Sequence, residues 1–335
     1  MTGTVRPNGE GEPRIQARLF DADRTDRLLT FEEAIASKAT ERQLLWIDIA
    51  GEITDEQRKA LVDRFALHPA TDRALAEPRG HPRVQLHGKH FHLRLAAEPD
   101  AMHPEDVRWL DVVAGPNVAI TRHERELELL DALNERIAAD ATIGVLDSAE
   151  FVASLLDAVV TSYHAAVDGV EDELDDFDFK ALSKPTSEKL SVELVGIRRR
   201  VGRLRRLLAA HREPFGSIGR PDFARGISSE DPEVFAQVVG RFEAALVSVE
   251  ATRQIVLASF DVLMTRTAQR TNEVMRILTL ATVLFLPATV TAGFLGMNVI
   301  VPVPDKDPMS FWIILGAVLV FEAVVIVIAK VKGWI

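Results

Sequence analysis

The chain reads ILTLATVLFLPATVTAGFLGMN from Ile277 to Asn298, and this stretch contains no charged residue. At about 1.5 Å rise per residue, a helix of this length crosses a hydrocarbon layer of roughly 30 Å. A second apolar run, FWIILGAVLVFEAVVIVIA, extends from Phe311 to Ala329. The sequence therefore predicts a membrane protein with two spans, at residues 277–298 and 311–329.

A second pattern runs along the first span. Alternating steps of three and four residues connect polar, small or flexible side chains into one stripe, whereas most other positions are apolar. The stripe consists of Asn272, Met275, Thr279, Thr282, Leu286, Thr289, Gly293 and Gly296. In lipid it must face protein or water. Two interpretations stay open: the threonines bond to their own helix carbonyls and the glycines allow close packing, or the stripe lines a pore.

The end of the stripe favours the pore. The chain continues through Gly296, Met297 and Asn298, where we expect the helix to stop and a short polar loop to begin. Several copies around an axis would then form a ring of backbone carbonyl and asparagine oxygens. Magnesium is usually bound through retained water molecules, so a neutral ring that hydrogen-bonds a hydrated ion suits it better than a cage of carboxylates.

Composition limits the other possibilities. The 335 residues include no cysteine, which excludes disulfides and thiolate zinc sites and fits a cytoplasmic location for the soluble part. The formal charge of -11 argues against nucleic acid and for cations as partners. Residues 1–14 lack an apolar segment, so we expect a disordered tail there and no signal peptide.

Residues 15–147 predict a cytosolic α/β domain. A buried strand is expected from Leu44 to Ala50, and alternating residues predict two hairpins, from Val84 to Leu95 and from Val107 to His123. Helical spacing covers Thr54 to Ala66, with Thr54 as its cap, and Leu127 to Ala139. No nucleophile, phosphate loop or pair of acids stands out, so we expect neither an enzyme nor a covalently bound cofactor.

Three histidines lie in the first hairpin, at His87, His90 and His92. Imidazole is the commonest side-chain metal ligand, so two of them could bind a metal ion. The alternative is that they are ordinary solvated strand residues.

Residues 148–276 predict a helical stalk. A long amphipathic helix begins at Ser148 and carries an acidic run, and a second helix, after Lys184-Pro185, carries a basic run. The acidic run comprises Asp168, Glu171, Asp172, Glu173, Asp175, Asp176 and Asp178, and the basic run comprises Arg198, Arg199, Arg200, Arg203, Arg205 and Arg206. The two runs suggest attraction between neighbours, although each could simply be a solvated helix face.

The stalk is expected to continue into the first span. Glycines and prolines predict a turn region from Pro214 to Pro232. Beyond it, no proline occurs before Pro287, which predicts a single helix on the order of 100 Å long.

Charge around the spans predicts their orientation. Arg266, Arg270 and Arg276 precede the first span, and Lys330 and Lys332 lie in the basic tail at residues 330–335. The loop at residues 299–310 carries Asp305 and Asp307, so the positive-inside rule places both termini in the cytosol. Glu322 lies within the second span and is a candidate proton site; the alternative is a protonated side chain bonded to a neighbouring helix.

The segment RTNEVMRILTLATVLFLPATVTAGFLGMN (Arg270 to Asn298), the short loop, the second span and the end KVKGWI resemble the CorA family of magnesium and cobalt transport proteins. Upstream, LLWIDI (Leu44 to Ile49), RFALHP (Arg64 to Pro69), HPRVQLHGKHFHLRL (His81 to Leu95) and VAITRH (Val118 to His123) resemble the soluble domain of that family. The likeness thus covers nearly the whole chain.

The resemblance implies an α+β protein of the inner membrane that assembles as a funnel-shaped homopentamer. The stalk and first spans would line one axial pore, with Gly296 and Asn298 at an outer selectivity ring. It also implies gating by cytosolic magnesium bound between subunits. The residues expected to face the lumen are Asn272, Met275, Leu278 or Thr279, Thr282, Leu286 and Thr289.

Two positions depart from the family pattern. Leu295 replaces the aromatic residue that usually precedes the glycine, and the loop lacks the usual Met-Pro-Glu. The ZntB zinc transporters, which are related proteins with a similar body, also vary at these places. The metal is therefore less determined than the fold.

The sequence leads to one main hypothesis and two rivals. The hypothesis is influx of Mg2+, with Co2+ or Ni2+ as further cargo, through a pore with apolar constrictions at Met275, Leu278 and Leu286 and cation-attracting Asp305 and Asp307 outside. The first rival is a proton-driven zinc transporter that uses Glu322. The second is a membrane-tethered sensor whose spans are only anchors.

Overall fold

The computed structural model describes residues 14–21, 26–40, 42–77, 80–99, 107–139, 148–183, 188–220, 223, 233–297 and 308–333. The chain divides into two compact units, Met1–Ala258 and Ser259–Ile335.

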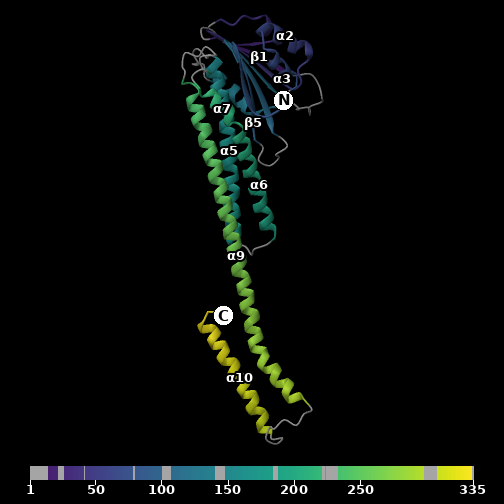
Figure 1. The fold of residues 1–335 in the computed structure, drawn as a ribbon, viewed down its shortest axis with the longest axis vertical. Helices are drawn as coiled ribbons and strands as arrows, with labels where there is room; N and C mark the ends of the chain where they lie inside the picture. Colours follow the sequence, from purple (N-terminus) through teal and green to yellow (C-terminus); the bar gives the residue numbers. More distant parts are fainter. Residues whose placement is uncertain are drawn as a thin grey trace, which may run out of the picture. The chain divides into compact units, whose positions relative to one another are not determined.

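The first unit contains a seven-stranded sheet, which is drawn at the top of Figure 1. Its strand order is β2-β1-β3-β7-β6-β5-β4. The strands are β1 (Arg14–Asp21), β2 (Arg27–Leu29), β3 (Gln43–Ala50), β4 (Arg83–His87), β5 (His90–Glu98), β6 (Arg108–Gly115) and β7 (Val118–His123). Neighbouring strands are antiparallel, except that β3 and β7 pair in parallel. The predicted strand at Leu44 to Ala50 is confirmed as β3.

Both predicted hairpins are confirmed. In the first, His87 pairs with His90 across the loop Gly88-Lys89, and Gly88 has a φ of 64°. In the second, Gly115 pairs with Val118 across Pro116-Asn117. Each tight loop thus contains a residue with positive φ, Gly88 in one and Asn117 in the other, and these residue types tolerate that conformation.

Three short helices pack against the sheet and share a hydrophobic core with it. They are α1 (Phe31–Ala36), α2 (Asp55–Phe65) and α3 (Pro69–Ala76). Leu61 of α2 and Leu75 of α3 share a buried cluster with Leu45, Ile47 and Ile49 of β3. Thr54 caps α2 as predicted: its hydroxyl accepts the Gln57 N–H, and the Gln57 side chain accepts the Thr54 N–H.

The alternate residues of β3 contact the long helix α5 (Ser148–Ser183). The Trp46 and Phe151 rings lie 5.1 Å apart, and the Tyr163 hydroxyl of α5 donates to the Ala96 carbonyl at 3.1 Å. Since β3 buries both of its faces, its sequence is an almost continuous apolar run. Helix α4 (Glu128–Ala139) corresponds to the predicted helical spacing from Leu127 to Ala139.

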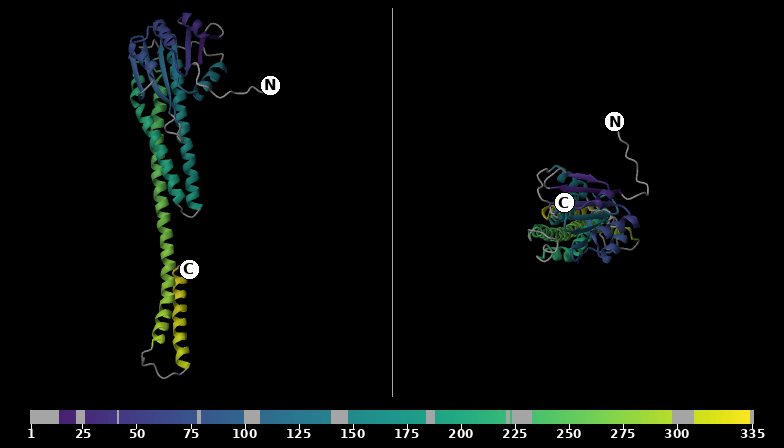
Figure 2. Two further views of the ribbon diagram at one scale, coloured as in Figure 1. Left: turned by 90° about the vertical axis from the view of Figure 1, so that its right-hand side faces the viewer. Right: turned by 90° about the horizontal axis from the view of Figure 1, so that it is seen from above.

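The predicted acidic and basic helices are α5 and α6 (Glu188–Ala210), which run side by side in opposite directions (Figure 2). Lys180 pairs with Glu193 at 2.7 Å, and Glu173 pairs with Arg200. Thr252 of a third long helix, α9 (Ala236–Gly296), donates its hydroxyl to Glu171 of α5 at 2.6 Å. Part of the charge in both runs is thus paired within one chain.

The turn predicted from Pro214 to Pro232 is wrong at its start. A helix, α7 (Arg212–Ile218), passes through Pro214. Proline is tolerated there because it lies in the first turn, where backbone N–H groups have no helical partner. Burial of Phe215 and Ile218 stabilises this helix. Most of the remaining segment lies outside the described residues.

Two long helices carry the predicted spans. Helix α9 (Ala236–Gly296) has 61 residues, about 90 Å at 1.5 Å per residue, and contains Pro287. Helix α10 (Pro308–Val331) has 24 residues. Both are long and apolar enough to cross a membrane, and their most apolar windows are 0% and 6% buried.

Candidate functional site

The polar stripe of α9 lies on an exposed side of the helix. All eight stripe residues from Asn272 to Gly296 are exposed. The less exposed residues of this segment follow their own stripe, which consists of Leu280, Ala281, Leu284, Pro287, Ala288 and Thr291. At 100° per residue the two stripes lie on nearly opposite sides of the helix. The polar stripe is therefore not the side of α9 that this chain covers.

The stripe threonines bond to their own helix. The hydroxyls of Thr279, Thr282 and Thr289 donate to the carbonyls of Met275, Leu278 and Phe285, at 2.7, 2.9 and 2.8 Å. The first interpretation of the threonines is thus present in the structure. It leaves the pore interpretation intact, because a hydroxyl that donates its one proton inward keeps its oxygen lone pairs as acceptors.

This geometry suits a hydrated cation. The water molecules around a metal ion direct their hydrogens outward and need acceptors, which the three hydroxyl oxygens offer without any charge. Helix α9 ends at Gly296, the first residue of the Gly-Met-Asn sequence, and Met297 follows as an exposed residue. Asn298, Asp305 and Asp307 lie outside the described residues.

Large apolar side chains lie on or beside the stripe. Met275, Leu278 and Leu286 are 55%, 60% and 59% exposed. Between turns that offer hydroxyls, these side chains supply the apolar levels that a dewetting constriction requires.

Glu322 lies on the less exposed side of α10. It is half-buried and shares a stripe with Ile314, Val318, Val325 and Ala329, of which Ala329 is buried. A carboxyl group on this side of a membrane helix faces protein more than lipid, as is usual for ionisable residues within spans.

The three hairpin histidines have partners other than a metal. His92 is buried with its Nε2 2.8 Å from Asp111, and His90 Nε2 lies 3.3 Å from the Thr71 hydroxyl. The His87 ring stacks on that of His68 at 4.2 Å. Within the described residues, no three His, Asp or Glu side chains converge where they could hold a metal ion. The geometry of the hairpin thus gives the predicted metal role no support.

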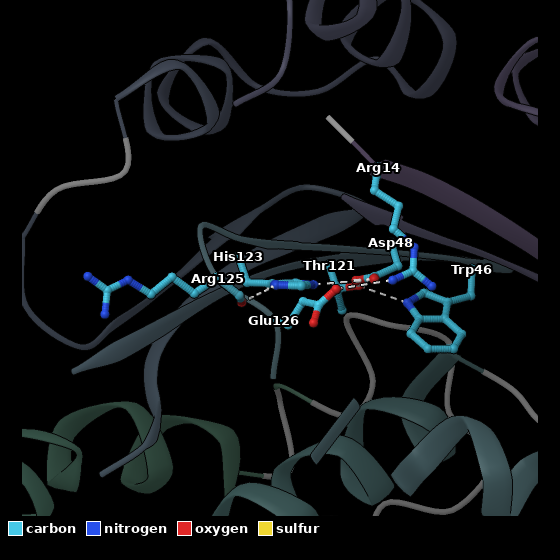
Figure 3. Close-up of polar contacts among 7 residues, drawn as sticks. All are labelled: Arg14, Trp46, Asp48, Thr121, His123, Arg125 and Glu126. Carbon is cyan, nitrogen blue, oxygen red and sulfur yellow. Dashed lines mark hydrogen bonds and ion pairs between the residues drawn. The ribbon is translucent and has the colours of Figure 1, made fainter. Parts of the chain in front are cut away.

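A polar cluster that the sequence did not predict joins the central strands β3 and β7 (Figure 3). The Trp46 indole donates to the Thr121 hydroxyl at 2.9 Å, and that hydroxyl donates to Asp48. Asp48 Oδ2 also lies 3.3 Å from His123 Nε2, and His123 Nδ1 lies 2.5 Å from the Arg125 carbonyl.

Both nitrogens of His123 therefore face acceptors. Burial lowers the pKa of this imidazole, but the hydrogen bond to Asp48, the Asp48 charge and the Arg125 carbonyl outweigh burial and raise the pKa above its usual value. The only sequence signal was that Asp48 and His123 each lie in a segment with a family resemblance, and nothing along the chain indicated that they meet.

Known proteins resemble this chain along most of its length. The profile of the CorA-like Mg2+ transporter protein family matches residues 41–331. The cobalt/magnesium transport protein CorA of Thermotoga maritima is 24% identical over 293 residues, which cover 87% of this chain and 83% of that protein.

Solved structures share the fold. The complete CorA magnesium transporter from Methanocaldococcus jannaschii matches with a TM-score of 0.74 and 20% identity, over 96% of this chain and 98% of that one. The ZntB cytoplasmic domain from Vibrio parahaemolyticus matches with a TM-score of 0.60 and 13% identity, over 76% and 99% of the two chains. Because the family profile extends over most of its length, the chain belongs to the CorA-like Mg2+ transporter family, as a divalent-cation transporter.

Proposed function

We propose that this chain forms a homopentameric channel that carries Mg2+, with Co2+ and Ni2+ as further cargo, into the cytoplasm down its electrochemical gradient. The observation that carries the proposal is the exposed hydroxyl stripe of α9, which ends at Gly296. Lipid tails offer no hydrogen-bond donors to the hydroxyl oxygens of this stripe, whereas copies arranged around an axis bring them into contact with water. Family membership and the name of the Thermotoga maritima relative support the choice of cargo.

Selection occurs at the end of the stripe in this proposal. The Gly296 carbonyl and the Asn298 side chain accept hydrogen bonds from the water shell of the ion, next to Met297. Asp305 and Asp307 attract cations to the outer loop at residues 299–310. Both termini are cytosolic, and the membrane is the inner membrane.

Gating uses the apolar levels of the same helix. Met275, Leu278 and Leu286 close the pore by excluding water when the five helices approach each other, and they admit hydrated ions when the helices separate. Cytosolic divalent ions favour the closed state, which limits uptake when the metal is abundant.

The test is ion flux in vesicles that contain the purified protein, across Mg2+, Co2+, Ni2+ and Zn2+. Asn298→Ala removes the amide of the ring, and Thr282→Val with Thr289→Val removes two lumen-facing acceptors. Two lost hydrogen bonds of about 1 kcal/mol each predict a fall in Mg2+ flux on the order of tenfold or more. The control is Thr291→Val, which removes a hydroxyl on the opposite side of α9 and leaves flux unchanged.

The variants also define failure. Flux by Asn298→Ala equal to that of the unaltered protein contradicts the selectivity ring. Equal losses from the stripe variant and from Thr291→Val contradict the pore lining, because the loss then reflects helix packing.

A zinc transporter driven by protons is the second candidate. The observation that favours it is Glu322, half-buried on the less exposed side of α10. Zinc uptake that depends on a pH gradient, and loses this dependence in Glu322→Gln, supports this candidate. Magnesium flux without a pH gradient, unchanged in Glu322→Gln, supports the channel.

A further inference from the structure

Helix α5 carries an exposed stripe that is acidic along one part and apolar at its end. Asp168, Asp172 and Asp175 are exposed, and they are followed on the same side by Phe179 and Leu182. The two apolar side chains are 73% and 56% exposed. Among the described residues, none of the three carboxylates forms an ion pair, in contrast to Glu173 on the neighbouring side of the helix.

Helix α6 carries a stripe of the opposite charge. Arg199 and Arg206 are exposed, and they lie seven residues apart on one side of the helix. Val192, seven residues before Arg199, is 67% exposed and completes the stripe. Arg200 and Arg205, which pair with α5 and α9, lie on other sides of α6. The stripe is thus the part of the basic run that this chain does not use internally.

The two stripes have the same residue spacing, and they lie at the same height along the paired helices. Leu182, Asp175 and Asp168 are separated by seven residues each, as are Val192, Arg199 and Arg206.

The ion pairs Lys180–Glu193 and Glu173–Arg200 fix the register of the antiparallel helices, since both partners shift by seven residues from one pair to the next. This register places Leu182, Asp175 and Asp168 level with Val192, Arg199 and Arg206, respectively, to within one residue, over about 21 Å of helix.

We propose that the α5 stripe of one copy binds the α6 stripe of the next copy of this chain. Apolar Leu182 and Phe179 then contact Val192, Asp175 faces Arg199, and Asp168 faces Arg206. The inference rests on the proposed homo-oligomer and adds a contact that orders its subunits.

The charges specify the direction of this contact. Two α5 stripes placed against each other oppose carboxylates, and two α6 stripes oppose guanidinium groups, so contacts between like stripes are disfavoured. When two copies are joined by one contact of α5 on α6, one copy keeps a free α6 stripe and the other keeps a free α5 stripe. Further copies bind to these free stripes until the assembly closes into a ring. Because the matching residues of α5 and α6 lie at the same height along the helix axes, they meet when neighbouring copies have the same orientation. Subunits that share one orientation in the membrane meet this condition.

Cross-linking tests the contact. The chain has no cysteine, so Leu182→Cys with Val192→Cys gives a reporter without background. In the full-length protein in vesicles, a short bis-maleimide joins neighbouring copies into a ladder of covalent oligomers that ends at the closed ring. The matched control, Leu182→Cys with Arg206→Cys, places the thiols about 21 Å apart along the helices and gives no ladder.

Charge reversal in the reporter background tests the pairing itself. Arg199→Glu with Arg206→Glu slows cross-linking by about tenfold, because carboxylates then face carboxylates and encounter is disfavoured. Addition of Asp168→Arg and Asp175→Arg restores the rate. All four positions are exposed on helix surfaces, and far-UV circular dichroism checks that each variant folds.

Flux measured on the same vesicles separates the two proposals. Flux with no ladder, or with covalent dimers only, overturns the stripe contact and leaves the channel standing. A ladder without flux in any metal keeps the contact and overturns the channel. Failure of the charge swap to restore cross-linking also overturns the contact.

Discussion

The two units of this chain use the same apolar residue types for opposite purposes. In Met1–Ala258, leucine, isoleucine and valine fill a core on both faces of a sheet, and the buried charges of Arg94 and Asp111 are paired with each other. In Ser259–Ile335, residues of the same kinds cover the surface, and the most apolar windows are 0% and 6% buried. Exclusion of apolar side chains from water stabilises the first unit, whereas the apolar surface of the second unit suits contact with lipid. The buried fraction of a side chain in a single chain therefore indicates its contribution to stability in the first unit but not in the second.

The largest expected effect breaks the first unit. Asp111 is buried and bonds both Arg94 and His92. Asp111→Ala removes the carboxylate that these two side chains share and leaves the Arg94 charge buried, so we expect a loss of about 3–5 kcal/mol in the free energy of unfolding. Urea titration followed by Trp46 and Trp109 fluorescence measures it, in a background with Trp312→Phe and Trp334→Phe.

The control removes a carboxylate from the surface. Glu126 pairs with Arg14 with both side chains more than 60% exposed, so Glu126→Ala should cost at most about 1 kcal/mol. Similar losses in the two variants would show that burial does not determine the strength of these pairs.

The next effect separates the two kinds of exposed leucine. Leu28 in β2 is 74% exposed and Leu319 in α10 is 56% exposed. Leu28→Lys should change the free energy of unfolding by no more than about 0.5 kcal/mol. Leu319→Lys should disfavour insertion of α10 by about 2.5–3.5 kcal/mol, measured with a glycosylation reporter of membrane insertion. If both substitutions are tolerated, α10 does not face lipid at this position.

Two buried histidines of the first unit should respond to pH in opposite directions. Burial lowers the pKa of His211 to about 4, and its Nε2 accepts the Ala96 N–H at 3.0 Å. The unfolded chain then binds the proton more tightly, so stability falls by up to about 3 kcal/mol as pH decreases from 6.5 to 4.

The pKa of His123 is raised, so its contribution is present at low pH and is lost as pH rises through the folded-state value. Urea midpoints measured across pH check both signs. His211→Gln should flatten the acid side of the profile, and His123→Gln should leave that side unchanged. A flattened acid side in the His123 variant alone would reverse the assignment.

The smallest effect compares two threonines. The Thr54 hydroxyl accepts an N–H that has no helical partner, so Thr54→Ala should cost about 1 kcal/mol of stability. The Thr282 hydroxyl donates to a carbonyl within its helix, so Thr282→Ala should change helix stability by less than about 0.5 kcal/mol. Urea unfolding measures the loss of stability in Thr54→Ala, and circular dichroism in detergent measures the helix stability of Thr282→Ala. Loss of helix in Thr282→Ala would give that hydroxyl a structural role.

Local patterns predicted the elements of this fold because their causes are local. The alternation around Gly88-Lys89 and the cap at Thr54 are set by residues a few positions apart, and both are present. The stripe of α9 could be predicted for the same reason, since it depends only on helical spacing. Helix α7 was missed because Pro214 and the glycines after it are local signals for a turn. The burial of Phe215, which stabilises the helix, depends on residues distant in the sequence.

Contacts between distant residues could not be predicted. The parallel pairing of β3 with β7 brings Asp48 within 3.3 Å of His123, although 75 residues separate them. The level match of α5 and α6 likewise requires the register of the folded pair. For the same physical reason, the sequence indicated the polar stripe of α9 but did not indicate which sides of α5 and α6 remain unused.

Pro287 gives the 61-residue helix α9 one mechanically weak point. Proline has no N–H, so the Val283 carbonyl one turn earlier receives no hydrogen bond from residue 287, and the ring crowds that carbonyl. Elsewhere in α9, continuous backbone hydrogen bonds resist bending. At Pro287 one of these bonds is already missing, so bending the helix there disrupts one hydrogen bond fewer. A tilt imposed on the long arm before Pro287 need not therefore be transmitted in full to the short arm that ends at Gly296.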